Sequence, residues 1–331
     1  MPRDPSAASR PETGRAAVRM RLDPQIADML EALDAGFPHV ETMTGAQARE
    51  AIRARVVAPA HPEGVGSVHD QTIPGDVTVR IYRPATESPL PILVYAHGGG
   101  FVFCDLDSHD GLCRSFTNRI PAVVISVAYR LAPEHPWPAA AEDVYAVAQW
   151  AARNADALGG DASRIVVGGD SAGGNLAAAA ALMARDRGGP SLAGQLLIYP
   201  MVNADFDTES YRLFGEGYYN PRVALQWYWD QYVPSAADRE HPYASPLKAD
   251  LRGLPPTVVV AAGHDPLRDE GSAFVAALKT ANVQTAHCHY EGGIHGFMTM
   301  PAVDLAQRAR AEVCSELARL LRLAQRSAGI S

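Results

Sequence analysis

The distribution of apolar and polar positions predicts a sheet of buried strands separated by helices. Residues 77–81 alternate between apolar and polar, as in a strand with one buried face, and this stretch ends at Pro84. Five other stretches are continuous apolar runs, which are typical of strands buried on both faces: 92–95, 123–127, 165–167, 196–198 and 258–260. Because helical patterns at 139–153 and 175–187 lie between them, we expect an α/β fold with a mostly parallel, doubly wound sheet.

The N-terminal part shows a helical pattern instead. Residues 26, 29, 30 and 33 are apolar and fall on one face of a helix that begins near Asp23. A second helix is predicted from Thr44 to Arg55, with Thr44 as its cap and Gln47 as the partner in a capping box. Residues 1–20, rich in Arg, Pro, Ser and Ala, are expected to form a loose tail.

Residues from about 203 to 245 interrupt the alternation of strands and helices. This segment has no clear strand but many aromatic residues, namely Tyr211, Phe214, Tyr218, Tyr219, Trp227, Tyr228, Trp229 and Tyr232. Because the insertion follows a strand, we interpret it as a cap over the strand ends. The alternative is a set of ordinary core helices.

Composition and charge narrow the range of partners. The 331 residues are 47% hydrophobic and 20% charged, which suits a globular protein with a sizeable core. A net charge of -8 without a basic cluster disfavours nucleic acid and anionic membranes. The longest apolar stretch, 176–184, is about half of what a membrane-spanning helix needs. We expect no stable membrane insertion, and a homodimer is left open.

The N-terminus and the cysteines indicate a cytoplasmic protein. Residues 1–21 contain five arginines and lack the apolar core of a secretory signal. The four cysteines include no C-x-x-C pair and are too few to form a disulfide framework in so long a chain. We expect each of them to be a reduced, small buried hydrophobic residue.

The strongest chemical signal is the sequence G-D-S-A-G at 169–173. It lies between a predicted strand and a predicted helix, where a sharp turn exposes a serine hydroxyl. Ser171 is therefore the candidate nucleophile. The backbone N–H groups that follow it open a helix, where unpaired donors favour negative charge.

A second signal is the sequence H-G-G-G at 97–100, directly after a buried strand. Three glycines let bare backbone approach a substrate and direct N–H groups at one oxygen, as the oxyanion of acyl transfer requires. A phosphate-binding loop is the weaker alternative, since no G-K-[ST] and no complete G-x-G-x-x-G are present.

A nucleophilic serine needs a base, and the base needs an orienting acid. His295 lies in a glycine-rich loop after the strand-like stretch 283–290, so the loop can bring its imidazole across the strand ends. Asp265 follows the buried strand that ends near residue 261, at the edge where open α/β sheets place ligands. The order Ser171, Asp265, His295 is the order found in α/β-hydrolases.

Five motifs together resemble the hormone-sensitive-lipase family of α/β-hydrolases, over roughly residues 70–325. They are H-G-G-G-F (97–101), Y-R-L-A-P-E-H-P-W-P-A-A-A-E-D (129–143), G-D-S-A-G-G-N (169–175), D-P-L-R-D-E-G (265–271) and E-G-G-I-H-G-F (291–297). The resemblance implies an α/β-hydrolase fold with helices on both faces of the sheet and a helical cap. It also implies Ser171 as nucleophile, His295 as base and Asp265 as its orienter. The oxyanion donors would then be the N–H groups of Gly99, Gly100 and Ala172.

Other candidate residues have simpler interpretations. His287 and His289 are two apart on a strand, and without a third ligand we favour plain strand residues over a metal pair. Asp269 could replace Asp265, but it is expected inside the following helix. Asp170 is expected to hydrogen-bond locally. Two further expectations concern the motifs: His97 holds its loop, and Glu142 and Asp143 brace the loop that begins at Tyr129.

These observations predict a carboxylic ester hydrolase that acts on short- to medium-chain esters through an acyl-serine intermediate. We expect a small-molecule ester substrate and neither a metal nor an organic cofactor. The predicted parts are a tail (1–20), cap helices (21–60) and a catalytic domain (61–331) with the cap insertion at about 203–245. The alternatives are a hydrolase of amides, carbamates or sugar acetates, and a ligand receptor on the same fold, such as the plant gibberellin receptor. A receptor would be expected to lack a complete triad.

Overall fold

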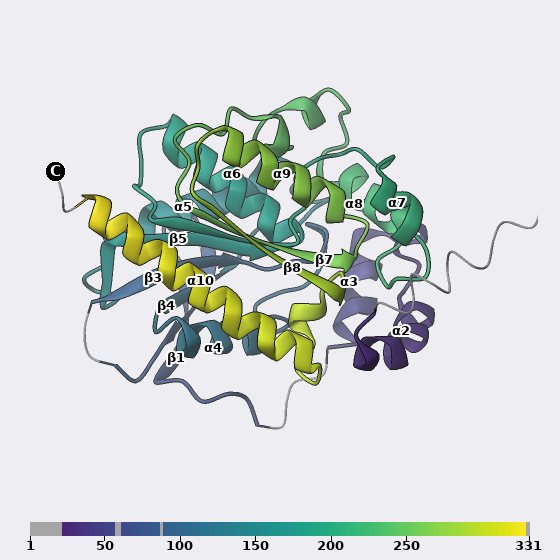
Figure 1. Cartoon of the computed structure of the whole chain (residues 1–331), viewed down its shortest axis with the longest axis horizontal. Coiled ribbons are helices and arrows are strands. Elements are labelled where there is room, and N and C mark those ends of the chain that lie inside the picture. Colours follow the sequence, from purple (N-terminus) through teal and green to yellow (C-terminus); the bar gives the residue numbers. More distant parts are fainter. Residues whose placement is uncertain (1–21, 57–60, 87–88, 329–331) are drawn as a thin grey trace, which may run out of the picture.

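One eight-stranded sheet runs through the centre of the computed structural model, which describes residues 22–56, 61–86 and 89–328 (Figure 1). The strands are β1 (Ser67–Ile73), β2 (Val77–Arg83), β3 (Leu90–Ala96), β4 (Val123–Ala128), β5 (Gly160–Asp170), β6 (Gly194–Ile198), β7 (Thr257–His264) and β8 (Thr285–Ile294). Their order across the sheet is β1-β2-β4-β3-β5-β6-β7-β8. Strands β3 to β8 pair in parallel, whereas β1 and β2 are antiparallel to their neighbours. The predicted mostly parallel α/β fold is confirmed.

Helices cover both faces of the sheet. The helices of the described residues are α2 (Pro24–Gly36), α3 (Gly45–Arg53), α4 (Asp110–Arg119), α5 (Ala139–Arg153), α6 (Ala172–Asp186), α7 (Glu209–Phe214), α8 (Arg222–Tyr232), α9 (Arg268–Thr280) and α10 (Asp304–Ala328). Helices α5, α6 and α9 pack on one face, and α4 and α10 pack on the other. Strand β7 reads as a continuous apolar run because its side chains point alternately into both layers: Val259 into the first, Val258 and Val260 into the second.

The N-terminal helices form as their local sequence dictates. Asp23 caps α2 by accepting the N–H of Gln25 at 3.0 Å, and Ile26 is buried beneath the helix. Helix α3 begins with the predicted capping box between Thr44 and Gln47. The predicted tail at 1–20 lies outside the described residues.

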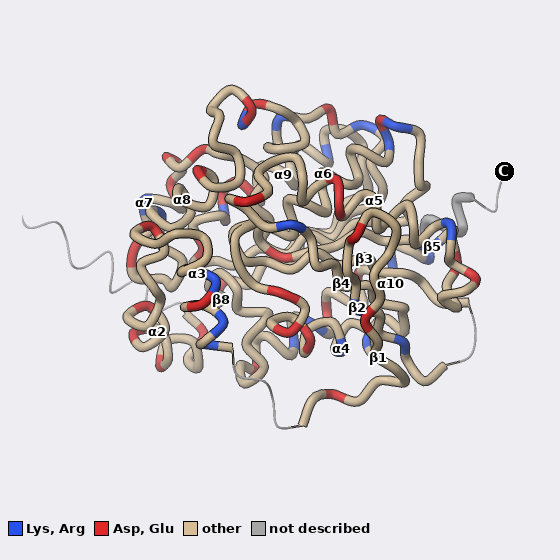
Figure 2. The backbone as a smooth tube through the Cα atoms, turned by 180° about the vertical axis from the view of Figure 1, so that it is seen from behind, with Lys and Arg blue, Asp and Glu red and all other residues tan. Residues whose placement is uncertain are grey.

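Segments far apart in the sequence gather at the carboxyl end of the parallel strands. Figure 1 shows α2, α3, α7 and α8 at the end toward which β7 and β8 point, and Figure 2 shows the same grouping from behind. Residues 203–245 contain α7 and α8 and no strand. The assignment of these helices to a cap, and the domain limits, stay predictions.

Two features bear on expectations about the environment of the protein. No helix in the described ranges is both long and apolar enough to cross a membrane. All four cysteines are free; Cys113 and Cys314 are buried, and Cys104 and Cys288 are partly buried. Burial raises the pKa of the Cys113 thiol to about 12, so this thiol stays protonated at neutral pH.

Candidate active site

Ser171 occupies a sharp turn between β5 and α6, at the carboxyl end of the sheet. Its φ of 56° lies in the left-handed region, which is uncommon for a residue with a side chain. The turn is tight enough to require glycine on both sides. A Cβ on Gly169 would lie 2.3 Å from the carbonyl oxygen of Gly173, and one on Gly173 would lie 2.0 Å from that of Ala96. The small neighbours in the motif therefore allow the turn that exposes the serine.

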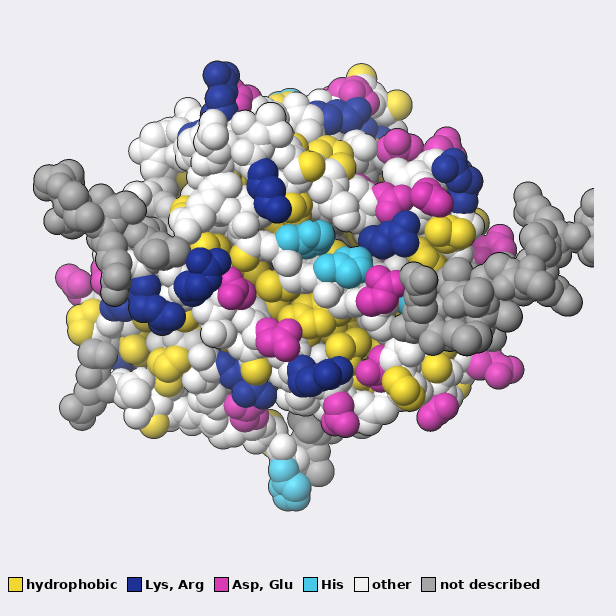
Figure 3. Space-filling model, in the orientation of Figure 1, with side chains coloured by type: hydrophobic (Ala, Val, Ile, Leu, Met, Phe, Trp, Pro, Cys, Tyr) yellow, Lys and Arg dark blue, Asp and Glu magenta, His cyan; other side chains and the backbone are white. Residues whose placement is uncertain are grey.

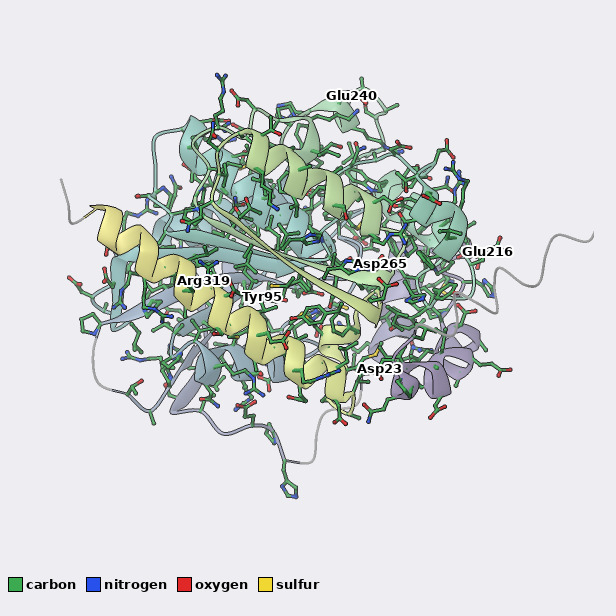
Figure 4. The ribbon with its side chains drawn as sticks, viewed as in Figure 1. Asp23, Tyr95, Glu216, Glu240, Asp265 and Arg319 are labelled. Carbon is green, nitrogen blue, oxygen red and sulfur yellow. The ribbon has the colours of Figure 1, made fainter. Side chains whose placement is uncertain are left out.

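The structure brings Ser171, His295 and Asp265 together from three separate segments. The Nε2 atom of His295, directly after β8, lies 2.9 Å from Ser171 Oγ. Its Nδ1 atom lies 2.8 Å from Asp265 Oδ2. Figure 4 labels Asp265 at the end of the sheet nearest α2 and α7. A chain of two hydrogen bonds thus leads from the hydroxyl through the imidazole to the carboxylate, the arrangement that activates a serine.

Asp265 is held rigidly behind the imidazole. It follows β7 directly and is completely buried. Its second oxygen, Oδ1, accepts the N–H of Leu267 at 2.8 Å, so one oxygen is fixed by backbone while the other faces His295. A buried carboxylate held in this way keeps the proton of a neutral imidazole on Nδ1 and leaves Nε2 free to accept a proton from serine.

The glycine loop after β3 places bare backbone beside the serine. Gly99 and Gly100 have φ of 117° and 57°, and the carbonyl of Gly99 accepts the N–H groups of Val102 and Phe103 at 3.0 Å each. Both glycines line the same cavity as Ser171. Within the described part of the chain, no acceptor contacts the N–H groups of Gly99 and Gly100. These two donors are therefore available to an oxygen in the cavity.

Two other elements hold the glycine loop in place. The ring of Tyr228, on α8, lies against Gly100, where a Cβ would come within 2.5 Å of Tyr228 Cγ. Helix α3 contributes Arg49, whose guanidinium donates to the carbonyl of Val102 at 2.8 Å and to that of Ala132 at 3.0 Å. The loop is thus held between the N-terminal segment and the insertion. Ala172, the third predicted donor, is the first residue of α6, where helical N–H groups lack partners within the helix.

Asp170 joins the nucleophile turn to the glycine loop. Its Oδ1 accepts the Tyr95 hydroxyl at 2.8 Å and the Gly98 N–H at 3.0 Å, and its Oδ2 lies 3.3 Å from His109 Nε2. The expectation of local hydrogen bonds is wrong, because the fold places Tyr95 of β3, Gly98 of the glycine loop and His109 around this carboxylate. Burial opposes the charge of this carboxylate, but the charge of His109 and the hydrogen bonds of His109 and Tyr95 hold its pKa below the usual value.

No role for His109 or for Tyr95 was predicted from the sequence. His109 lines the cavity, yet it stands outside the motifs and nothing in its local sequence marks it. Tyr95 is a polar-tipped residue near the end of an otherwise apolar strand, and that position is a signal that could have identified it.

His97 holds the glycine loop, as predicted. Its Nδ1 lies 2.7 Å from the carbonyl oxygen of Gly98, and its ring stacks on Tyr129 at a centroid distance of 4.3 Å. The Tyr129 hydroxyl donates to the backbone carbonyl of His97 at 2.8 Å. Burial and the nearby charge of His109 lower the pKa of His97 to about 4, so the ring is neutral at physiological pH.

Asp269 lies in α9, as expected, and away from His295. Its carboxylate accepts the N–H of Ser210 and pairs with Arg268. In the neighbouring motif, Asp143 accepts the backbone N–H of Arg130 at 2.9 Å and so braces the loop as predicted.

Glu142 does not brace that loop. It pairs instead with Arg187, just beyond α6. Its side chain is one position away from Asp143 on the helix α5, so it points toward a different neighbour.

His287 and His289 are neighbours on β8, with ring centroids 5.9 Å apart. Figure 3 shows histidine side chains side by side in the middle of the face where β8 and α10 meet. His289 Nε2 lies 3.2 Å from the Glu291 carboxylate. Over the described residues, no group of three or more His, Cys, Asp or Glu side chains is arranged to hold a metal ion.

The cavity above Ser171 has a volume of about 110 Å³, and four aromatic residues contribute to its walls. Phe37, at the end of α2, and Tyr219, between α7 and α8, form one wall. Phe103 and Tyr228 lie on the side of the glycine loop, with ring centroids 5.5 Å apart. Residues from the N-terminal segment and from the insertion therefore both line the space in which a substrate would react.

Comparisons with known proteins identify the family of the chain. A family profile for the alpha/beta hydrolase fold matches residues 93–299. Carboxylic ester hydrolase LipN of Mycobacterium tuberculosis is 42% identical over 263 residues, covering 76% of this chain and 70% of that protein. Carboxylesterase NlhH of the same species is 38% identical over 292 residues, covering 85% of this chain and 91% of that protein. The solved structure of a hyperthermophilic esterase from the archaeon Pyrobaculum calidifontis has a TM-score of 0.86 at 40% identity, covering 91% of this chain and 99% of that one. The chain therefore belongs to the hormone-sensitive-lipase-like esterases of the alpha/beta hydrolase fold.

Proposed function

We propose that the protein hydrolyses carboxylic esters of short to medium acyl chain through an acyl-serine intermediate on Ser171. The observation that carries the proposal is the hydrogen-bonded series of Ser171 Oγ, His295 and Asp265, with distances of 2.9 and 2.8 Å, beside a loop of unpaired glycine N–H groups. The names of the similar proteins, which are ester hydrolases, support the same reaction class.

In the first half of the reaction, His295 Nε2 takes the proton of Ser171 as the serine Oγ attacks the acyl carbon. The N–H groups of Gly99, Gly100 and Ala172 donate to the oxyanion that forms, and Asp265 stabilises the imidazolium. The tetrahedral intermediate then loses the alcohol, whose oxygen receives the proton from His295 Nε2. The acyl group remains as an ester of Ser171.

The second half repeats these roles with water. His295 takes a proton from the water as its oxygen attacks the acyl carbon, and the same three N–H groups hold the second oxyanion. Collapse of this intermediate returns the proton to Ser171 Oγ and releases the carboxylic acid. Every proton is carried by His295, so a single imidazole serves as base and as acid in each half.

The size of the cavity favours short acyl chains. Its volume of about 110 Å³ is below the roughly 300–1,000 Å³ of typical drug-sized ligand pockets. The rings of Phe103 and Tyr228 limit it on the side of the glycine loop. We further propose that α2, α3, α7 and α8 act together as a cap, since Phe37, Tyr219 and Tyr228 reach the cavity from these segments or directly beside them.

Covalent labelling tests the proposed nucleophile. A fluorophosphonate probe reacts with an activated serine, so the wild-type protein should be labelled at Ser171 and the Ser171→Ala variant should not. Unlabelled wild-type protein would overturn the proposal and leave the receptor alternative. Parallel assays with p-nitrophenyl acetate, the matching anilide, a carbamate and an acetylated sugar separate an esterase from the other hydrolases. A higher kcat/KM on the anilide or the carbamate would overturn the ester assignment, whereas a higher kcat/KM on the acetylated sugar, which is also an ester, would identify a sugar as the alcohol.

A further inference from the structure

Tyr219 has an unusual backbone that the N-terminal helix holds in place. Its φ of 75° lies in the left-handed region, which is disfavoured for a bulky residue. Its N–H donates to the Asp34 carboxylate, on α2, at 3.0 Å. These residues are 185 positions apart in the chain. The hydrogen bond to the Asp34 carboxylate thus stabilises a backbone conformation of Tyr219 that the local sequence does not favour.

The same helix also fixes the ring of Tyr219. The ring meets Phe37 edge to face, with centroids 5.3 Å apart and an interplanar angle of 77°. Burial raises the pKa of Tyr219, and the charge of Arg55 together with a hydrogen bond to it opposes the rise. The backbone and the ring of Tyr219 therefore contact Asp34 and Phe37, at the C-terminal end of α2.

The position of the Tyr219 ring indicates that it faces the alcohol part of an ester substrate. A Cβ on Gly296, next to His295, would lie 3.8 Å from Tyr219 Cε1, so the ring stands beside the loop that carries the imidazole. In the proposed reaction His295 Nε2 gives its proton to the departing alcohol, which must lie on this side of the cavity. The ring of Tyr228 lies instead against Gly100, beside the proposed oxyanion loop.

We propose that Tyr219 determines specificity for the alcohol part of the ester, favouring alcohols that carry an aromatic ring, and that Asp34 is the positioning residue that holds it. This inference rests on the proposed esterase function. Removing the carboxylate frees the strained backbone, and the ring then leaves the wall that it forms with Phe37. A small alcohol has no ring to place against this wall, so hydrolysis of its esters should change less than hydrolysis of aromatic esters.

Two esters with one acyl group test the inference. For the wild type and Asp34→Ala, kcat and KM are measured with benzyl acetate and ethyl acetate, whose alcohols differ in one aromatic ring. Because aromatic contacts contribute about 0.5–1.5 kcal/mol, the benzyl-to-ethyl ratio of kcat/KM should fall roughly twofold to thirteenfold. The change should lie in KM for benzyl acetate, with kcat within about twofold, because the contact is remote from the reacting bond.

Matched variants separate positioning from a general structural role. Asp34→Asn keeps an oxygen that accepts the Tyr219 N–H, and it should restore the wild-type ratio. Tyr219→Gly tolerates the backbone conformation and removes the ring, so it should lower the ratio as Asp34→Ala does. In that background Asp34→Ala should change the ratio no further.

A wild-type ratio in Asp34→Ala or in Tyr219→Gly, or equal loss in Asp34→Asn, would overturn the inference. Additive effects in the double variant would also overturn it. These outcomes require an active wild type. If wild-type protein hydrolyses neither ester and resists the fluorophosphonate, the proposed function fails instead.

Discussion

Asp170 is the residue whose loss should damage stability and catalysis together. Replacing it by alanine removes the acceptor of the Tyr95 hydroxyl, the Gly98 N–H and His109 Nε2, all of which are buried. Each buried donor without a partner costs about 1–3 kcal/mol, so the free energy of unfolding should fall by about 3 kcal/mol or more. Because Gly98 begins the oxyanion loop, kcat should fall by about 10²-fold, the lower range for losing one oxyanion donor.

Asp170→Asn is the matched control for this prediction. The asparagine Oδ1 still accepts from Tyr95 and Gly98, while its amide group faces His109 in place of a carboxylate oxygen. His109 Nε2 also lies 3.2 Å from Oδ1, so the asparagine keeps one oxygen beside His109 and loses the negative charge and the second oxygen. The free energy of unfolding should therefore fall by no more than about 1–2 kcal/mol. The loss in kcat should stay within about tenfold, because the oxyanion loop keeps its hydrogen bond to the nucleophile turn.

Urea denaturation and steady-state hydrolysis of p-nitrophenyl butyrate measure both effects. The two variants are compared with the wild type at pH 7, where the lowered pKa of Asp170 keeps its carboxylate charged. The reasoning is refuted if Asp170→Ala unfolds within 1 kcal/mol of the wild type. It is equally refuted if that variant keeps kcat within threefold, or if Asp170→Asn is as damaged as Asp170→Ala.

Three further predictions follow from the site. Ser171→Ala should keep the wild-type fold by circular dichroism and lose at least about 10⁴-fold in kcat, and residual activity above one per cent would contradict its role as nucleophile. On p-nitrophenyl esters, kcat/KM should be higher for butyrate than for palmitate, because the cavity is confined; the reverse order would refute the acyl-chain proposal. The pKa of His97 is about 4 in the folded protein and 6.5 in the unfolded chain. Between these values the unfolded chain binds a proton that the folded protein does not, so the free energy of unfolding is highest above pH 6.5 and falls as the pH is lowered toward 4. The free energy of unfolding should fall by about 3 kcal/mol over this interval. In His97→Gln, urea denaturation should give a free energy of unfolding that depends less on pH between 4 and 6.5, and a dependence equal to that of the wild type would contradict the prediction.

The central strands could be predicted because both of their faces are buried. Val258, Val259 and Val260 are apolar in succession since helices cover each side of β7. Strand β1 gave no such signal: it pairs with β2 at the edge of the sheet, and most of its side chains are exposed. Backbone pairing, which leaves little trace in an edge sequence, determines its position. Helices α4 and α10 were not predicted either.

The predicted site residues stand in motifs whose spacing reflects a local requirement. Glycines around Ser171 and before Phe101 are needed for close backbone approach, so they are visible in the sequence. His109 and Tyr219 reach the cavity through tertiary packing, and their neighbours in the sequence reveal nothing of it. The partner of Tyr219, Asp34, is likewise an ordinary helical carboxylate until the fold joins the two segments.

The close packing of the nucleophile turn against β3 limits how the sequence of such a protein can change during evolution. Gly173 approaches the carbonyl of Ala96 so closely that not even one methyl group fits between them, whereas Phe37, Tyr219 and Tyr228 stand on segments outside the sheet. The nucleophile turn and strand β3, which form the floor of the site, admit almost no variation. The segments that carry Phe37, Tyr219 and Tyr228, which form its roof, can be exchanged one at a time. Substrate range can therefore diverge without rebuilding the chemistry, and a variant library directed at the roof should retain many more active members than one directed at the floor.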